Sequence, residues 1–156
     1  MTPTSYEARL NELGLQLPPF PKPQGVYKPL VQVGNLVYLS GHGPLRPDGT
    51  FVTGRLGAEL DLDAGKAAAR LVGLAILTTL RNYLGSLDRV RRLIKTLGLV
   101  NCTPEFTQHP QVINGASELM AELFGLENGI GARSAFGAVS IPGGWPVEIE
   151  MIFEIE

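Results

Sequence analysis

The sequence contains only one cysteine among its 156 residues, and it has no long apolar run. A single thiol, at Cys102, cannot form an internal disulfide framework, and it fits a reducing compartment. The most apolar stretch, "AAARLVGLAILTTL", is too short to span a bilayer and contains Arg70. The opening residues, "MTPTSYEARL", lack an apolar signal core. We therefore expect a soluble, cytoplasmic protein that does not contact a membrane.

Positive charge is also scarce. The chain has 13 Lys and Arg residues against 15 Asp and Glu residues, which gives a formal net charge of −2. In the longest basic run, "RVRRLIK", basic and apolar residues alternate, which is typical of a strand whose charged side chains face solvent. Because nucleic-acid binding usually requires a basic face, a nucleic-acid partner is not expected.

The motifs of metal and cofactor sites are missing as well. Two histidines and one cysteine without paired spacing do not make a zinc site. The loop "GHGPLR" places Arg46 where a dinucleotide-binding motif has its third glycine, and no phosphate loop or G-x-S-x-G motif is present. We expect no metal and no cofactor. Cys102 is interpreted as a small buried hydrophobe, and His109 as a helix-start residue.

What the sequence does contain is a clear pattern of strands and helices. Thr4 and Glu7 suggest a capping box for a first helix that ends at Gly14, and the prolines within residues 17–25 predict an extended arm. The other expected elements are two strands within 26–40, a short return strand at 50–54, a long helix from Asp61 or Asp63 to Leu84, a strand over 90–102 and a second helix over 109–125.

The order of these elements predicts the fold class. Strands occur both before and between the helices, which indicates an α+β domain with helices on one face of a sheet. An apolar fraction of 44% suffices for a buried core. We expect one domain over residues 1–156, in which residues 1–24 form an N-terminal helix and proline-rich arm.

Residues 131–156 are predicted to form a β-hairpin that turns at Gly143–Gly144. In "VEIEMIFEIE" apolar residues alternate with four glutamates, so one face of the strand should be buried and the other exposed to solvent. Glu148 lies beside the glycine-rich turn, where a ligand can approach the backbone closely. The three glutamates that follow it are interpreted as ordinary exposed side chains.

Arg133 lies at the other end of this segment, and an arginine in a small apolar hairpin needs an anionic partner. In a tight hairpin Val139 would pair with Glu148, and Arg133 would lie on the same uncovered face, about 20 Å away at ~3.3 Å per residue. One chain could not then bring both side chains onto one small ligand. This geometry favours sites between the subunits of an oligomer, or no joint role for the two residues.

Three segments carry a family resemblance. "GARS" followed by "IPGGWPVEIE" resembles the carboxy-terminal motif of the Rid family, the reactive intermediate deaminases, also called the YjgF or L-PSP endoribonuclease family. "GVYKPLVQVGNLVYLSGHGP" resembles its first hairpin and loop, and "HPQVINGASELMAELFG" its second helix. The resemblance implies a chorismate-mutase-like α+β fold, with two main helices on one face of a mixed or antiparallel sheet. It also implies a homotrimer with a central barrel and clefts between subunits.

The resemblance also assigns candidate roles. Arg133 matches the arginine that binds the substrate carboxylate, and Glu148 matches the glutamate that activates water, so both are candidate catalytic residues. The implied reaction is hydrolysis of an enamine or imine, such as 2-aminoacrylate, to a 2-keto acid and ammonia. The implied partner is therefore a small carboxylate-bearing metabolite. The candidate substrate-binding residues are Tyr27, Ser40, Gly41, His42, Asn114 and Pro142.

Two departures from the family pattern leave other functions open. Ala135 stands where deaminating members commonly have cysteine, and His42 stands where glutamine is frequent. A non-catalytic trimer that binds a keto acid or an amino-acid-like metabolite is one alternative. An endoribonuclease, the activity in the older family name, is the least supported because the chain is acidic.

Overall fold

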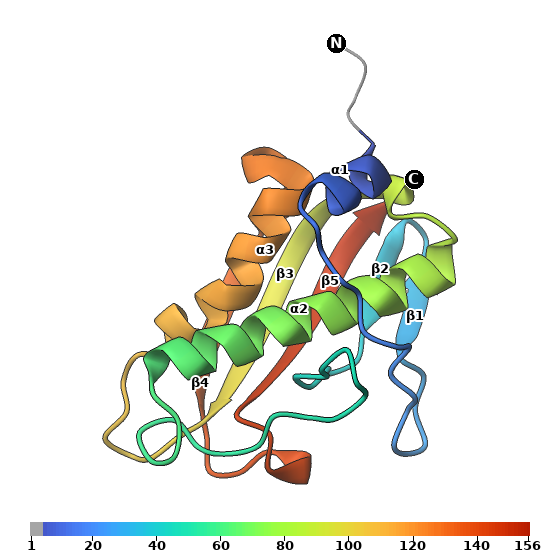
Figure 1. The fold of residues 1–156 in the computed structure, drawn as a ribbon. Coiled ribbons are helices and arrows are strands. Elements are labelled where there is room, and N and C mark those ends of the chain that lie inside the picture. The colour runs from blue at the N-terminus through green and yellow to red at the C-terminus, as the bar shows by residue number, and fades with distance from the viewer. Residues whose placement is uncertain (1–4) are drawn as a thin grey trace.

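The computed structural model describes residues 5–156, which form a five-stranded sheet with helices on one face (Figure 1). The strand order is β1-β2-β5-β3-β4, and only β3 and β4 are parallel neighbours. The predicted α+β class, with two main helices on one face of a mixed sheet, is confirmed. The elements are α1 (Tyr6–Glu12), β1 (Leu30–Val33), β2 (Leu36–Leu39), α2 (Leu62–Leu84), η1 (Leu87–Arg89), β3 (Val90–Asn101), α3 (His109–Gly129), β4 (Ala132–Ala138), η2 (Pro142–Gly144) and β5 (Val147–Ile155).

Helix α2 begins and ends where its capping residues predict. Asp61, one of the two candidate caps, accepts a hydrogen bond from the Ala64 backbone N–H at 2.8 Å. Gly85 ends the helix in the left-handed conformation, with φ of 82°. Most of the side chains between these ends are buried, so α2 forms the main cover of the sheet.

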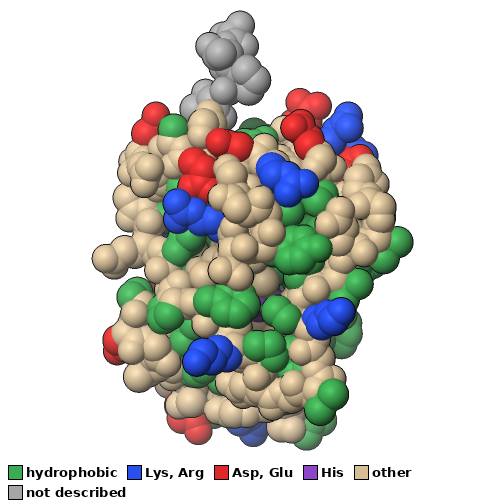
Figure 2. Space-filling view, turned by 90° about the vertical axis from the view of Figure 1, so that its right-hand side faces the viewer, with side chains coloured by type: hydrophobic (Ala, Val, Ile, Leu, Met, Phe, Trp, Pro, Cys, Tyr) green, Lys and Arg blue, Asp and Glu red, His purple; other side chains and the backbone are tan. Residues whose placement is uncertain are grey.

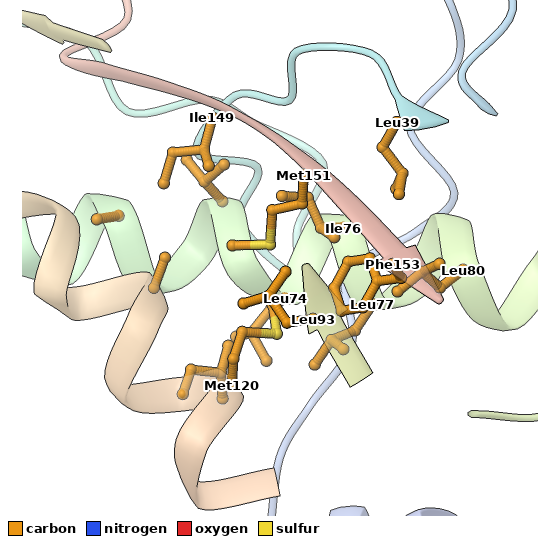
Figure 3. Packing of buried hydrophobic residues seen from close by; sticks show 14 of the residues in the cluster. Leu39, Leu74, Ile76, Leu77, Leu80, Leu93, Met120, Ile149, Met151 and Phe153 are labelled. Carbon is orange, nitrogen blue, oxygen red and sulfur yellow. The ribbon is translucent and has the colours of Figure 1, made fainter. Parts of the chain in front are cut away.

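The core lies between the helices and the central strand β5. Ile149, Met151 and Phe153 point from β5 toward α2, and Phe153 lies beside Leu77 and Leu80 (Figure 3). Full burial of such a side chain stabilises the fold by roughly 1.5–3 kcal/mol. Because side chains alternate along a strand, Glu148, Glu150 and Glu154 lie on the opposite, uncovered face of the sheet.

The predicted hairpin of residues 131–156 is wrong. β4 pairs in parallel with β3, whereas β5 pairs antiparallel with β3 and β2, so β3 separates the two segments. β3, α3 and β4 thus form a βαβ unit, and η2 carries the chain back across the end of β3. A glycine-rich turn shows where the chain reverses, but it does not decide which strand the returning segment pairs with.

The predicted position of Arg133 on the uncovered face is also wrong. Arg133 lies opposite Thr96 in β3, and Thr96 is 2% exposed beneath the helices. Ala135 lies opposite Gly98, which packs against Ile113 of α3. Arg133 and Ala135 therefore face the helix side, because paired residues in a sheet point the same way.

The amino-terminal helix is capped differently from the prediction. Thr4 lies outside the described residues, and Ser5 caps α1. Glu7 does not complete a capping box. Its carboxylate accepts a hydrogen bond from the Leu87 N–H at 2.9 Å and pairs with Arg81 at 3.0 Å, which ties α1 to the end of α2.

The arm that follows α1 is extended, as predicted, and it runs along α2. The Thr78 hydroxyl donates to the Pro18 carbonyl at 3.0 Å and fixes the start of the arm. The return strand predicted at 50–54 is reduced to one bridge between Leu45 and Phe51. Of the helices in residues 5–156, none has the length and apolarity needed to cross a membrane.

Candidate functional site

The first half of the candidate site is an open hollow of about 420 Å³, here called the Glu148 hollow. It lies at the end of the uncovered sheet face, where β5 meets the loop after β2. Five residues named from the sequence line it together: Tyr27, Ser40, Gly41, Pro142 and Glu148. Gln24, Trp145 and Glu150 complete its walls.

Glu148 is half-buried, and its charge is not neutralised. Among residues 5–156, no hydrogen-bond donor or cation contacts its carboxylate. Burial raises the pKa of the Glu148 carboxyl above its ordinary value, and the nearby Glu150 carboxylate raises the pKa further. A raised pKa suits a group that must both accept and return a proton near neutral pH.

Gly41 is required for this position of Glu148. A Cβ atom at residue 41 would lie 2.8 Å from Cδ of Glu148, closer than side chains pack. The loop backbone therefore approaches the carboxylate directly, and a ligand in the hollow can reach both.

The arm and the loop after β2 hold each other in place. The Ser40 N–H donates to the Pro29 carbonyl at 3.0 Å, and the Ser40 hydroxyl donates to the Lys28 carbonyl at 2.6 Å. The Tyr27 hydroxyl accepts a hydrogen bond from the Gln24 N–H at 3.1 Å. The hydroxyl of Ser40 is thus engaged as a donor, and it offers a ligand only its oxygen lone pairs.

His42 is placed behind the hollow, not within it. The ring is 5% exposed, with Nδ1 2.6 Å from the Ser40 carbonyl and Nε2 2.7 Å from the Thr79 hydroxyl. Nδ1 must donate to the carbonyl, and Nε2 can then accept from Thr79, which describes a neutral ring. Burial lowers the pKa of His42, against a smaller opposing effect of the Ser40 hydrogen bond. His42 therefore links the loop to α2.

The second half of the site is a separate hollow of about 420 Å³ between α3 and β4, here called the Arg133 hollow. Nη1 of Arg133 donates to Oδ1 of Asn114 at 2.7 Å and to the Ser117 hydroxyl at 3.2 Å. Both partners are neutral, and within residues 5–156 no group accepts from Nε or Nη2. Glu118, which also lines the hollow, pairs with Lys66 at 3.4 Å. The guanidinium is oriented but keeps its charge available for an anion.

The two halves lie far apart within one chain. Arg133 of β4 and Met151 of β5 both lie opposite Thr96 of β3, so two strand spacings separate them. Met151 is three residues from Glu148 along β5. About 14 Å separates the two Cα atoms, at ~4.8 Å per strand and ~3.3 Å per residue. The side chains also point to opposite faces of the sheet. One chain cannot bring both to one small ligand, as the sequence predicted, although it predicted this from a wrong hairpin.

Some site residues were missed from the sequence. Glu150 shares the face of Glu148 by its two-residue spacing, and Ser117 shares a helix face with Asn114 by its three-residue spacing, so both signals were available. Trp145, the only tryptophan, stands in the glycine turn. Gln24 carries no sequence signal. Within the described residues, no three His, Cys, Asp or Glu side chains group closely enough to hold a metal ion.

Comparison with known proteins gives a consistent assignment. Residues 7–143 match the family described as "YjgF/chorismate mutase-like, putative endoribonuclease". Protein TCP17 of Trypanosoma cruzi is 39% identical, over 95% of this chain and 92% of that protein. A "putative endoribonuclease" from Shewanella oneidensis MR-1 is 30% identical, with a TM-score of 0.93 over 97% of this chain and all of that one.

A solved structure also links the chain to the Rid proteins. RidA from an Antarctic Psychrobacter species is 27% identical, with a TM-score of 0.61 over 87% of this chain and 94% of that one. The family match spans most of the sequence, and the resemblance found from the motifs is confirmed. The chain belongs to the YjgF/chorismate mutase-like family, which includes the Rid proteins.

Proposed function

We propose that the protein hydrolyses reactive enamines or imines, such as 2-aminoacrylate, to 2-keto acids and ammonia at clefts between subunits. One observation carries the proposal: two unneutralised charges of opposite sign, at Glu148 and Arg133, each open into a hollow. A substrate with a carboxylate at one end and an imine at the other offers a partner for each.

The chemistry assigned to each residue follows from its surroundings. The free Nε and Nη2 of Arg133 can hold a carboxylate through two charge-assisted hydrogen bonds, while Asn114 and Ser117 fix the plane of the guanidinium. Glu148 takes a proton from a water molecule as the water oxygen bonds to the carbon of the protonated imine, which gives a carbinolamine. Glu148 then returns this proton to the amine nitrogen, the C–N bond breaks to release ammonia, and the carbinolamine hydroxyl gives up its proton to solvent as the carbonyl forms. A placed general base of this kind contributes roughly 10²–10⁴-fold.

The intersubunit cleft requires an assembly, for which we propose a homotrimer. The uncovered sheet face carries large apolar side chains that are substantially exposed in a single chain: Val31 (47%), Val33 (63%), Tyr38 (43%) and Phe136 (50%). Packing these faces together around a central axis buries them and brings the Arg133 hollow of one subunit to the Glu148 hollow of its neighbour.

The charge distribution does not favour an endoribonuclease. Basic side chains on the face drawn in Figure 2 lie apart from one another and form no continuous patch. Among residues 5–156, several basic side chains are paired with acidic residues, among them Arg70 with Glu122 at 2.9 Å and Arg92 with Glu154 at 2.7 Å. RNA binding by phosphate contacts would need unpaired cations along one surface.

The proposed reaction is tested by generating 2-aminoacrylate in solution, trapping it competitively with semicarbazide, and following the release of pyruvate. The protein is expected to increase the pyruvate released at the expense of the trapped product, and Glu148→Gln is expected to abolish the increase. Glu154→Gln is the matched control, because Glu154 lies on the same face of the same strand but outside both hollows. Equal activity of the wild type and Glu148→Gln would remove Glu148 from the reaction.

A further inference from the structure

Cys102 and His109 form a thiol–imidazole pair that lines neither the Glu148 hollow nor the Arg133 hollow. Cys102 follows the last residue of β3, and His109 is the first residue of α3. Sγ of Cys102 lies 3.3 Å from Nε2 of His109, which is hydrogen-bonding distance for a sulfur atom. The sequence interpreted the two residues separately, as a buried thiol and a helix-start histidine. The fold brings them together and so places a nucleophile beside a base.

The imidazole is held in this position by its neighbours. The Phe106 ring packs against the His109 ring edge to face, with centroids 5.6 Å apart and 83° between the planes. When the proton of the neutral ring is on Nδ1, Nε2 is free to accept the proton of the thiol. His109 is partly exposed, so Nδ1 can exchange protons with solvent.

The surroundings of Cys102 make the thiol dependent on this base. Burial raises the pKa of the Cys102 thiol, and the positive charge of Arg55 opposes this with a smaller effect. Nη2 of Arg55 donates to the Cys102 carbonyl at 2.7 Å, which fixes the cation beside the residue. The thiol therefore stays protonated near neutral pH unless His109 removes its proton, and Arg55 stabilises the thiolate that forms.

A glycine leaves both reacting atoms open to approach from the edge of the sheet. Gly137 lies in the edge strand β4 and is exposed. A Cβ atom at this position would lie 2.9 Å from Nε2 of His109 and 3.1 Å from Sγ of Cys102. Any other residue would thus cover the pair with its side chain. Because Cys102 itself is only 8% exposed, the opening suits a small reagent.

We propose that Cys102 is a redox-sensitive site that reacts with small hydroperoxides, with His109 as its base. The sulfur bonds to the terminal oxygen of the hydroperoxide as the O–O bond breaks. His109 takes the thiol proton and gives it to the departing oxygen, which leaves as water or an alcohol. Cys102 is oxidised by two electrons to a sulfenic acid, and the hydroperoxide is reduced. The chain has no second cysteine, so no internal disulfide can follow.

The first experiment compares folded and unfolded protein. Hydrogen peroxide is added to the full chain in buffer and in concentrated urea at the same pH. Loss of the single thiol is followed by thiol titration, and the sulfenic acid is trapped with a 1,3-diketone and detected by mass. N-acetylcysteine in both solutions corrects for any effect of urea on the reaction itself.

The two readings of Cys102 predict opposite results. A thiol activated by His109 should react at least about tenfold faster in the folded protein than in urea, since a placed base contributes roughly 10²–10⁴-fold. A merely buried thiol should react more slowly in the folded protein. An equal or slower reaction of the folded protein would overturn the proposal.

The second experiment assigns the effect to the pair. His109→Gln should lower the rate of the folded protein toward the rate in urea, and Gly137→Ala should do the same while the histidine is kept. Gln108→Ala is the matched control, because Gln108 is exposed and its side chain makes no capping hydrogen bond to α3. Urea midpoints of all variants show that each is folded in buffer. A rate that both His109→Gln and Gly137→Ala leave unchanged would overturn the role of the pair.

These results do not depend on the proposed hydrolysis. Cys102→Ser should abolish formation of the sulfenic acid and leave imine hydrolysis unchanged, because Cys102 lies outside both hollows. Failure of the hydrolysis assay therefore leaves the peroxide reaction standing, and an unreactive thiol leaves the hydrolysis standing.

Discussion

The two hollows of this protein have similar volumes, but they are built from different kinds of structure and carry opposite charges. The Arg133 hollow is built on regular structure, since β4 presents the guanidinium and one face of α3 orients it through Asn114 and Ser117. The Glu148 hollow is built mostly from loops, in which the arm and a glycine at residue 41 leave room for a carboxylate without a partner. The first holds a cation that is oriented, and the second holds an anion whose pKa is raised.

Under the proposed function, this difference means that neither hollow is a complete site. A rigid, hydrogen-bonded cation is suited to binding an anion, whereas a half-buried carboxylate with a raised pKa is suited to moving a proton. Because the two lie on opposite faces of one sheet, the proposed function divides substrate binding and proton transfer between two places in the chain. The variants below test this division of roles, from the largest expected effect to the smallest.

Removal of the guanidinium should weaken substrate binding. Arg133→Ala is expected to lower kcat/KM by roughly 10- to 100-fold, from the loss of about 1.5–3 kcal/mol of hydrogen bonding to a charged group, and mainly through KM. Steady-state kinetics with the trapping assay measure this, and Arg70→Ala, on the outer surface of the helices and outside both hollows, is the control. A loss confined to kcat would contradict a binding role for Arg133.

Displacement of the carboxylate should affect proton transfer while binding is retained. Gly41→Ala introduces a Cβ 2.8 Å from Cδ of Glu148, so the side chain must move, and we expect kcat to fall about tenfold with little change in KM. In Gly25→Ala the new Cβ would meet the Tyr27 ring at an ordinary 3.5 Å, which makes it the matched control. Unchanged kcat in Gly41→Ala would show that the position of Glu148 is not critical.

Neutralisation of Glu150 should change the pH dependence. Its charge raises the pKa of Glu148, so Glu150→Gln is expected to lower that pKa and shift the acid limb of the kcat/KM profile to lower pH. The variant would then be several-fold more active than the wild type on the acid side of the profile. A limb that stays in place would mean that Glu148 is not the group that titrates there.

The stability of the fold should depend on pH through His42, which lies behind the Glu148 hollow. Burial lowers the pKa of His42 in the folded state, so the unfolded chain takes up this proton first as the pH falls. The free energy of unfolding should therefore decrease as the pH falls below about 6.5, and this group should not affect it above that pH. Chemical denaturation across pH tests this, because His42→Gln should remove the dependence whereas His109→Gln should retain it.

The sequence predicted well what local chemistry controls. The ends of α2 follow from Asp61 and Gly85, and the buried face of β5 follows from its alternation. The sequence-based prediction failed where pairing between distant strands determines the structure. The turn at 142–144 suggested a hairpin, although a strand, a helix and a strand in succession are also typical of a βαβ unit. The error in pairing then placed Arg133 on the wrong face. Burial of His42 could not be predicted, because its partner Thr79 is on a distant helix.

The most direct test of the central claim, that each site combines Glu148 of one subunit with Arg133 of another, is a complementation measurement. Arg133→Ala and Glu148→Gln proteins are mixed in equal amounts, dissociated and reassembled together, and assayed for imine hydrolysis at a substrate concentration well below KM, where each variant alone has little activity. Sites shared between subunits predict recovery of about a quarter of the wild-type activity, since that fraction of interfaces pairs an intact arginine with an intact glutamate. No recovery in verified mixed assemblies would contradict the account.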